Sequence, residues 1–191
     1  MEEITFEQLV AMDDDALDRV MRNGHPIDED VLAGRVYDGV SLNLPKLVMK
    51  LSWEKFAKVF HREPDGSLRG WNCKVEQSPL AEPWVLKIQK GAPITYGHYA
   101  VRPCDAYRLP RPYDGGLMLD YGLGGNGRLD PTRNLRDPVV AVNEGDSTLL
   151  LGWSYVDIAG ARVGTPSFFA LRRGAELAHT ATPPREPPPR S

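Results

Sequence analysis

The sequence predicts a mainly β fold, an antiparallel β-barrel preceded by N-terminal helices. Three observations support this prediction. Many short runs alternate apolar and polar residues, Asp65-Gly66 lies between two such runs, and a Gly-rich link at 159–164 joins two long ones. Asp-Gly between alternating runs is a strong β-hairpin signal. An antiparallel meander of this length usually closes into a barrel, because closure removes the exposed strand edges.

The first 33 residues are expected to form helices. Residues 5–12 are amphipathic, and Asp13 to Asp15 supply an N-cap and a negative first turn for a second helix over 16–22. Gly24 and the following His-Pro pair end that helix.

The barrel is predicted to occupy residues 34–175 and to contain about nine strands. A short lid or plug helix is expected over 44–51, between the first two strands. The Pro-rich tail, 176–191, is expected to be disordered. The predicted strands cover residues 35–42, 55–62, 68–76, 84–89, 95–102, 116–121, 138–143, 147–158 and 165–173.

Length and composition restrict the classes of function. A chain of 191 residues fits one barrel domain with a large core, and a net charge of −3 argues against a nucleic-acid partner. No apolar run approaches a membrane span, and the acidic N-terminus differs from a secretory signal, so a cytoplasmic location and no membrane partner are expected. Cys73 and Cys104 are expected to be free thiols rather than a disulfide.

Residues 122–127 match the pattern G-x-G-x-x-G and follow a strand. Dinucleotide binding requires a helix to begin at the third glycine, so that its N-terminus faces the pyrophosphate. Residues 128–131 contain Pro131 and favour no helix, and the chain has no βαβ rhythm. A flexible loop at the barrel mouth is therefore predicted.

The histidines predict no metal site. No two of the four have zinc-like spacing, and no cysteine lies beside them. A haem held by His98 alone is a further alternative, and the sequence favours no cofactor. No G-x-S-x-G motif is present to mark a hydrolase.

Candidate acid–base residues are His98, Asp120 and Tyr96. Tyr96 and His98 share one face of a predicted strand, and Asp120 lies opposite Leu119 and Tyr121 on another. The alternative for Asp120 is a solvent-facing or turn-capping role.

Aromatic side chains are the most informative candidates for a pocket, because Tyr and Trp combine an apolar wall with a polar group. The same residues would equally suit a closed core. Arg102 is the expected partner of a ligand carboxylate or phenolate. The predicted ligand-binding residues are Tyr37, Phe60, Trp71, Asn72, Arg102, Trp153, Tyr155 and Phe168.

Residues 32–39, which include Gly34, Tyr37 and Gly39, resemble the opening signature of small lipocalin-like barrels, in particular the bacterial GXWXG family. The run from Leu119 to Arg173 resembles the uncharacterised domain that accompanies this motif. The aromatic residue is Tyr rather than Trp, and one extra residue separates it from Gly34. The resemblance implies a calycin-type barrel that binds an apolar molecule.

The leading hypothesis is a lipocalin-like barrel, monomer or homodimer, that binds a hydrophobic or aromatic small molecule in its lumen. The alternative is a cofactor-independent cyclase or isomerase that acts on a polyketide- or terpenoid-like substrate in the same lumen. A third hypothesis is an interaction protein that docks through its Pro-rich tail.

Overall fold

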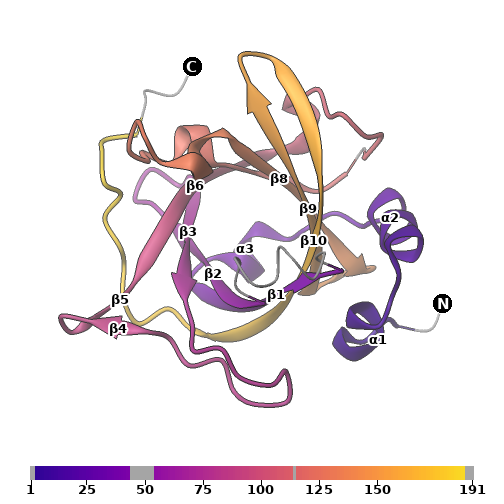
Figure 1. Ribbon diagram of the computed structural model, residues 1–191, viewed down its shortest axis with the longest axis horizontal. Helices are drawn as coiled ribbons and strands as arrows, with labels where there is room; N and C mark the ends of the chain where they lie inside the picture. The colour runs from indigo at the N-terminus through magenta and orange to yellow at the C-terminus, as the bar shows by residue number, and fades with distance from the viewer. Residues whose placement is uncertain (1–2, 44–53, 114, 188–191) are drawn as a thin grey trace.

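The computed structural model describes residues 3–43, 54–113 and 115–187, and its centre is a closed antiparallel barrel of eight strands (Figure 1). Around the barrel the strands follow the order β1-β10-β9-β8-β7-β6-β3-β2. The prediction of a mainly β fold with an antiparallel barrel is thereby confirmed. The barrel strands are β1 (Arg35–Leu42), β2 (Lys55–Arg62), β3 (Leu68–Lys74), β6 (Thr95–Pro103), β7 (Leu117–Asp120), β8 (Leu135–Asn143), β9 (Asp146–Ile158) and β10 (Ala161–Glu176).

In the described residues before the barrel, three short helices form: α1 (Phe6–Val10), α2 (Asp14–Arg22) and α3 (Glu29–Leu32). The first two correspond to the helices predicted over 5–12 and 16–22. Thr5 caps α1 through a capping box, and the Asp13 carboxylate accepts from the amide of the third residue of its helix at 2.8 Å. Figure 1 shows α1 and α2 on the outside of the barrel. Within the described residues, no helix is long and apolar enough to cross a membrane.

The turn between β2 and β3 confirms the predicted Asp-Gly hairpin. Gly66 adopts a positive φ of 85°, which a glycine reaches without steric cost. The Asp65 carboxylate accepts from the amide of Ser67 at 3.0 Å and so holds the turn.

The predicted strand over 84–89 does not join the barrel. Only β4 (Ile88–Gln89) forms there, and it pairs with β5 (Ala92–Pro93) in a separate two-stranded sheet. Trp84 instead packs over the outer face, where its indole donates to the carbonyl of Gly39 at 3.0 Å. The predicted helix over 44–51 lies outside the described residues.

Both faces of the barrel wall are buried. One cluster, which includes Phe60 and Leu150, lines the lumen, and Leu32 of α3 packs against one end of it. A second cluster lies between the outer wall and helices α1 and α2, and a third lies on the outer face of β2 and β3. Side chains that alternate along one strand therefore enter two different cores.

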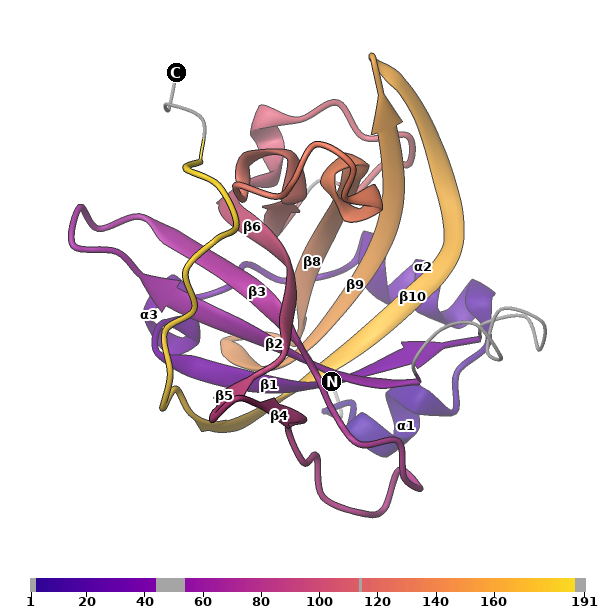
Figure 2. The same cartoon turned by 60° about the vertical axis from the view of Figure 1, so that its left-hand side comes forward.

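The C-terminal segment runs along the outside of the barrel (yellow in Figure 2). Ala181 is buried against the third cluster, and its carbonyl accepts from the Arg69 guanidinium at 3.1 Å. Farther on, the amide of Arg185 donates to the carbonyl of Gly125 at 2.9 Å. Truncation of this segment would measure what these contacts contribute to the stability of the barrel.

Both cysteines are buried free thiols, as predicted. Burial raises the pKa of the Cys73 thiol to about 11 and that of Cys104 to about 12. Neither side chain is poised to react as a thiolate near neutral pH.

Candidate functional site: a buried lysine in the barrel lumen

The two ends of the lumen differ in chemistry. At the α3 end, the Tyr37 hydroxyl donates to the carbonyl of Ser147 at 2.8 Å, and the Tyr37 ring meets Phe60 edge-on. The opposite end of the lumen is where β7 ends and β8 begins, and we refer to it as the mouth. Polar side chains enter the lumen on the mouth side.

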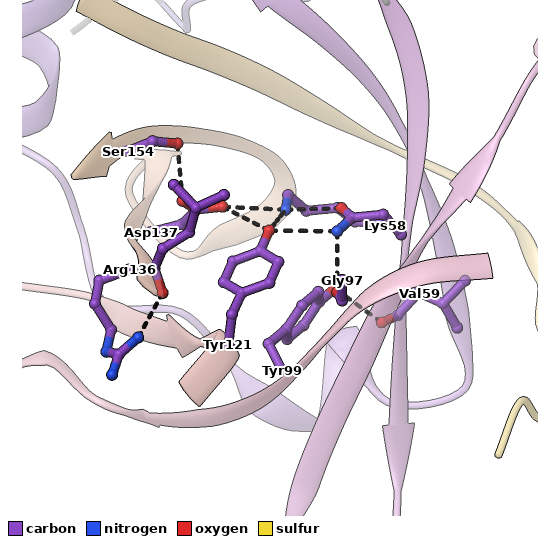
Figure 3. Close-up of polar contacts among 10 residues, drawn as sticks. Lys58, Val59, Gly97, Tyr99, Tyr121, Arg136, Asp137 and Ser154 are labelled. Carbon is purple, nitrogen blue, oxygen red and sulfur yellow. Dashed lines mark hydrogen bonds and ion pairs between the residues drawn. The ribbon is translucent and has the colours of Figure 1, made fainter. Parts of the chain in front are cut away.

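Lys58 is the centre of this polar group. It lies in the middle of β2, its side chain is 3% exposed, and its ammonium group has three partners (Figure 3). Nζ donates to the Tyr121 hydroxyl at 2.6 Å, to Asn72 Oδ1 at 3.0 Å and to Asp137 Oδ2 at 3.2 Å. These partners come from three other segments of the barrel, so closure of the barrel assembles the group.

Asp137 completes the group at the start of β8. Its Oδ2 also accepts from the Tyr121 hydroxyl at 2.8 Å, and its Oδ1 accepts from the Ser154 hydroxyl at 2.8 Å. The Asn72 amide donates to the carbonyl of Gly97 at 3.0 Å. Below, the lumenal polar cluster means Lys58, Asn72, Tyr121, Asp137 and Ser154.

Aromatic rings surround the ammonium of Lys58. Its Nζ lies 4.9 Å from the ring centre of Phe169, 5.1 Å from Tyr99, 5.2 Å from Tyr121 and 5.6 Å from Phe56. These distances are typical of cation–π contacts. The lumen thus offers a positive, hydrogen-bonding centre within an apolar, aromatic wall.

Two glycines make room for these rings. A Cβ atom at Gly39 would overlap the Phe56 ring, and one at Gly152 would overlap the Phe169 ring. Glycine in a strand often marks such a close approach. The Gly39 of the predicted signature segment therefore has a packing role in the lumen wall.

Burial dominates the electrostatics of the cluster. Burial lowers the pKa of the Lys58 ammonium, and the Asp137 carboxylate, which favours the charged form, opposes this shift. Burial also raises the pKa of the Tyr121 and Tyr99 hydroxyls well above the usual value, and the charge of Asp137 adds to both shifts. The tyrosines are therefore neutral hydrogen-bonding groups at physiological pH.

The structure places only some of the predicted ligand-binding residues in the lumen. Tyr37 and Phe60 line it at the α3 end, and Asn72 belongs to the lumenal polar cluster. Trp153, Tyr155 and Phe168 lie instead on the outer wall, so the expectation that they face the lumen is wrong.

The outward direction of Trp153 follows from the alternation along β9. Gly152 and Ser154 point inward, so the residues beside them point outward. Tyr113 covers the Trp153 ring edge-on, and the Arg111 guanidinium lies 4.5 Å from its ring centre. The largest aromatic side chains of β9 thus anchor the outer layer.

Trp71 and His98 also lie outside the barrel, which corrects the expected lumenal position of both. Their ring centres are 6.0 Å apart, and Arg69 lies over the indole at 5.0 Å. Among the described residues, His98 Nδ1 is buried without a hydrogen-bond partner, and burial, helped by the charge of Arg69, lowers the pKa of the imidazole to about 4. His98 is therefore neutral at physiological pH.

Asp120 has a structural position on the outer wall. Its carboxylate pairs with Arg136 at 3.1 Å, accepts from the Tyr107 hydroxyl at 2.8 Å and caps the short 3-10 turn that begins at Tyr121. Of the two roles that the sequence left open for Asp120, the structure matches the turn-capping one. Asp120 and His98 do not converge on the lumen.

Tyr96 and Arg102 complete the predicted set. Tyr96 is half-buried near the mouth, and burial raises its pKa, with smaller contributions from the charges of Cys73 and Asp137. Arg102 lies on the outer side of β6 near Tyr107. Burial and then Asp120 raise the pKa of Tyr107, and the charge of Arg102 weakly opposes this shift.

The glycine-rich run 122–127 is a packed loop. A Cβ at Gly124 would overlap the backbone of His98, and the Asn126 side chain bonds both the amide and the carbonyl of His98. No α-helix follows Gly127 in the described chain, where a 3-10 turn at Pro131–Asn134 comes next. The run thus lacks the helix that pyrophosphate binding requires.

Sequence reasoning missed Lys58, Tyr121, Asp137 and Ser154. The available signal was the pattern on β2, where Phe56, Lys58 and Phe60 share one face. A lysine between two phenylalanines on one strand face indicates a charge inside an apolar layer. Asp137, which precedes the apolar run of β8, gives no comparable signal.

Fold and cluster together define a closed antiparallel barrel with an ion pair in its lumen. The chain matches no family model, and none of the curated proteins is similar to it.

Proposed function

We propose that this protein binds a hydrophobic or aromatic small molecule in the barrel lumen, with a polar group of the ligand on the lumenal polar cluster. The observation that supports this most strongly is the burial of Lys58 among Phe56, Tyr99, Tyr121 and Phe169. An apolar pocket with a few convergent polar groups is the usual form of a small-molecule site.

The ion pair has little value for stability alone. Replacing a buried ion pair with well-packed apolar residues is often neutral or stabilising by about 1–4 kcal/mol. A lumen that served only as a core would be at least as stable with apolar residues at Lys58 and Asp137. Their presence favours a role in recognising a ligand.

The charge balance of the cluster indicates a neutral ligand. Lys58 and Asp137 cancel, and both are nearly completely buried. A bound anion would add one uncompensated charge to the lumen, at a cost of several kcal/mol. A carbonyl or hydroxyl oxygen accepts from Lys58 or Tyr121 without this cost, so we assign the ligand to neutral apolar molecules with one such group.

The lipocalin-like identity belongs to the same proposal. The segment 32–39, which resembles the GXWXG signature, leads into β1 and includes its first residues, and its Tyr37 and Gly39 both line the lumen wall. A binding barrel is what this resemblance implies.

The test uses prodan, a neutral aromatic ketone whose emission shifts to the blue in an apolar site. The wild-type protein should bind it, and Lys58→Met should weaken binding by about tenfold or more, since a hydrogen bond from a charged donor is worth about 1.5–3 kcal/mol. Lys55→Met is the matched control. Lys55 is also buried on β2, but it faces outward and bonds to Ser78 and to two carbonyls.

Lys55→Met should retain the affinity of the wild-type protein. Equal affinity in Lys58→Met, with that variant folded, would place the dye outside the lumen and overturn the proposal.

Catalysis in the same lumen is the second candidate, and the spacing of Lys58, Tyr121 and Asp137 favours it. A cofactor-independent isomerase needs one group to polarise a carbonyl and another to move a proton. Conversion of a β,γ-unsaturated ketone to its conjugated isomer, followed by ultraviolet absorbance, tests this. Turnover that is lost in Asp137→Asn while prodan binding persists would support an enzyme.

A further inference from the structure

We propose that Lys58 is a nucleophilic amine that captures an aldehyde or ketone as an imine in the lumen. This inference rests on the proposed binding function, and it assigns the ligand to carbonyl compounds.

The first support is the position of the amine. Lys58 Nζ lies inside the barrel wall, against the rings of Phe169 and Tyr99 at 4.9 and 5.1 Å. A carbonyl compound with an apolar or aromatic body that enters from the mouth would bring its oxygen to the same hydrogen-bond donors that now bond within the cluster. Lumenal burial also excludes bulk water, which hydrolyses imines.

The second support is the protonation equilibrium. An ammonium group has no lone pair, so the amine must release a proton before it attacks a carbonyl carbon. Burial lowers the pKa of Lys58, and desolvated lysines are the ones that form Schiff bases. The titratable groups that face the amine are Asp137, Tyr121 and Tyr99, of which Asp137 at 3.2 Å is the proton acceptor.

The third support is a proton path of hydrogen-bond length. The Tyr121 hydroxyl lies 2.6 Å from Lys58 Nζ and 2.8 Å from Asp137 Oδ2. The Tyr121 hydroxyl therefore bridges the amine of Lys58 and the carboxylate of Asp137, so a proton can pass between them through it. The Ser154 hydroxyl holds the other carboxylate oxygen, which orients Asp137 toward Lys58.

The reaction balances within these residues. Lys58 gives one proton to Asp137, and the free amine attacks the carbonyl carbon, so that a C–N bond forms and the C=O π pair moves to oxygen. A proton passes from nitrogen to that oxygen through Tyr121. Asp137 then returns its proton, and the C–O bond breaks with loss of water. The net change is an ammonium and a carbonyl to a protonated imine and water, with Asp137 again the counter-ion and no redox step.

The experiment traps the imine in the intact protein. Wild-type protein is incubated with trans-cinnamaldehyde and sodium cyanoborohydride, which reduces a protonated imine to a stable secondary amine. We expect a single adduct per chain by intact mass and its location at Lys58 by peptide mapping. Cinnamyl alcohol has the same phenylpropenyl skeleton but lacks the carbonyl group. It should compete for the lumen and reduce the labelling in proportion to the fraction of sites that it occupies.

Three variants sharpen the result. Lys58→Met should lose the adduct, whereas Lys55→Met should keep it. Asp137→Asn should label more slowly than the wild type at neutral pH, by on the order of tenfold or more, because it removes the proton acceptor. If Lys58→Met does not fold, the peptide map of the wild-type protein still identifies the modified lysine.

The outcomes separate the inference from the proposed function. Binding of cinnamyl alcohol or prodan without an adduct at Lys58 overturns the imine and leaves the binding function intact. Labelling spread over exposed lysines, unchanged by cinnamyl alcohol, overturns the imine as well. Absence of both binding and adduct overturns both proposals.

Discussion

Removal of the Asp137 carboxylate is the most informative perturbation of the lumen. In Asp137→Ala, the Lys58 ammonium and the hydroxyls of Tyr121 and Ser154 lose the acceptor that now lies 2.8–3.2 Å away. Breaking one side of a buried ion pair costs about 3–5 kcal/mol, because it leaves an uncompensated charge. We therefore expect a loss of about 3–5 kcal/mol in the free energy of unfolding at pH 7.

The loss should depend on pH. The folded-state pKa of Lys58 already lies below its ordinary value of 10.5, and without Asp137 it falls further. Between the folded value and 10.5 the unfolded chain binds more protons than the native protein, so stability rises with pH in that window. Asp137→Ala should accordingly regain stability relative to the wild type as the pH rises toward 10.5.

Urea unfolding followed by circular dichroism measures both effects. The double variant Lys58→Met/Asp137→Leu is the control, and it should recover most of the loss, because it removes both charges together. If Asp137→Ala unfolds within about 0.5 kcal/mol of the wild type at pH 7, the ion pair is not buried as described and the reasoning fails.

Three further predictions concern other parts of the molecule. Stability should fall as the pH drops from 6.5 toward 4, by up to about 3 kcal/mol, because the unfolded chain protonates His98 first. The charges that act on the ring are those of Arg69, which disfavours protonation, and of Asp130, which favours it, and His98→Gln should flatten the profile in acid unfolding curves. Deletion of residues 178–191 should lower the melting temperature and red-shift Trp71 emission, since Ala181 covers that cluster; an unchanged melting temperature would show that the segment is dispensable. Gly152→Val should destabilise the barrel by about 1–3 kcal/mol in urea, because its side chain would overlap the Phe169 ring, and a neutral result would mean that the lumen has room to spare.

The sequence predicted the β elements because their signals are local. Asp65-Gly66 specifies a tight turn, and alternating runs specify strands whatever lies on either side. The run 84–89 also alternates apolar and polar residues. Of these residues only Leu86 forms a β-bridge to Val75, because Trp84 already packs on the outer wall. Membership of the barrel is decided by pairing partners that are distant in the chain.

The direction of the side chains could not be read from the same pattern. On β9, Leu149, Leu151 and Trp153 face outward and Leu150 and Gly152 face inward, so both faces are apolar. Alternation distinguishes two faces only when one of them meets water. Helices α1 and α2 remove that contrast here, and the large residues were assigned to the wrong core.

The most direct test of the account is the response of Lys58 itself to a ligand. In protein labelled with ¹³C at the lysine ε-carbons, the Lys58 resonance should shift when prodan is added, and the Lys55 resonance should not. With ¹⁵N-labelled tryptophan in the same sample, the indole signals of Trp71 and Trp153 should stay nearly constant, because both lie outside the barrel. A shift of Trp153 or Lys55 with Lys58 unchanged would contradict a lumenal site.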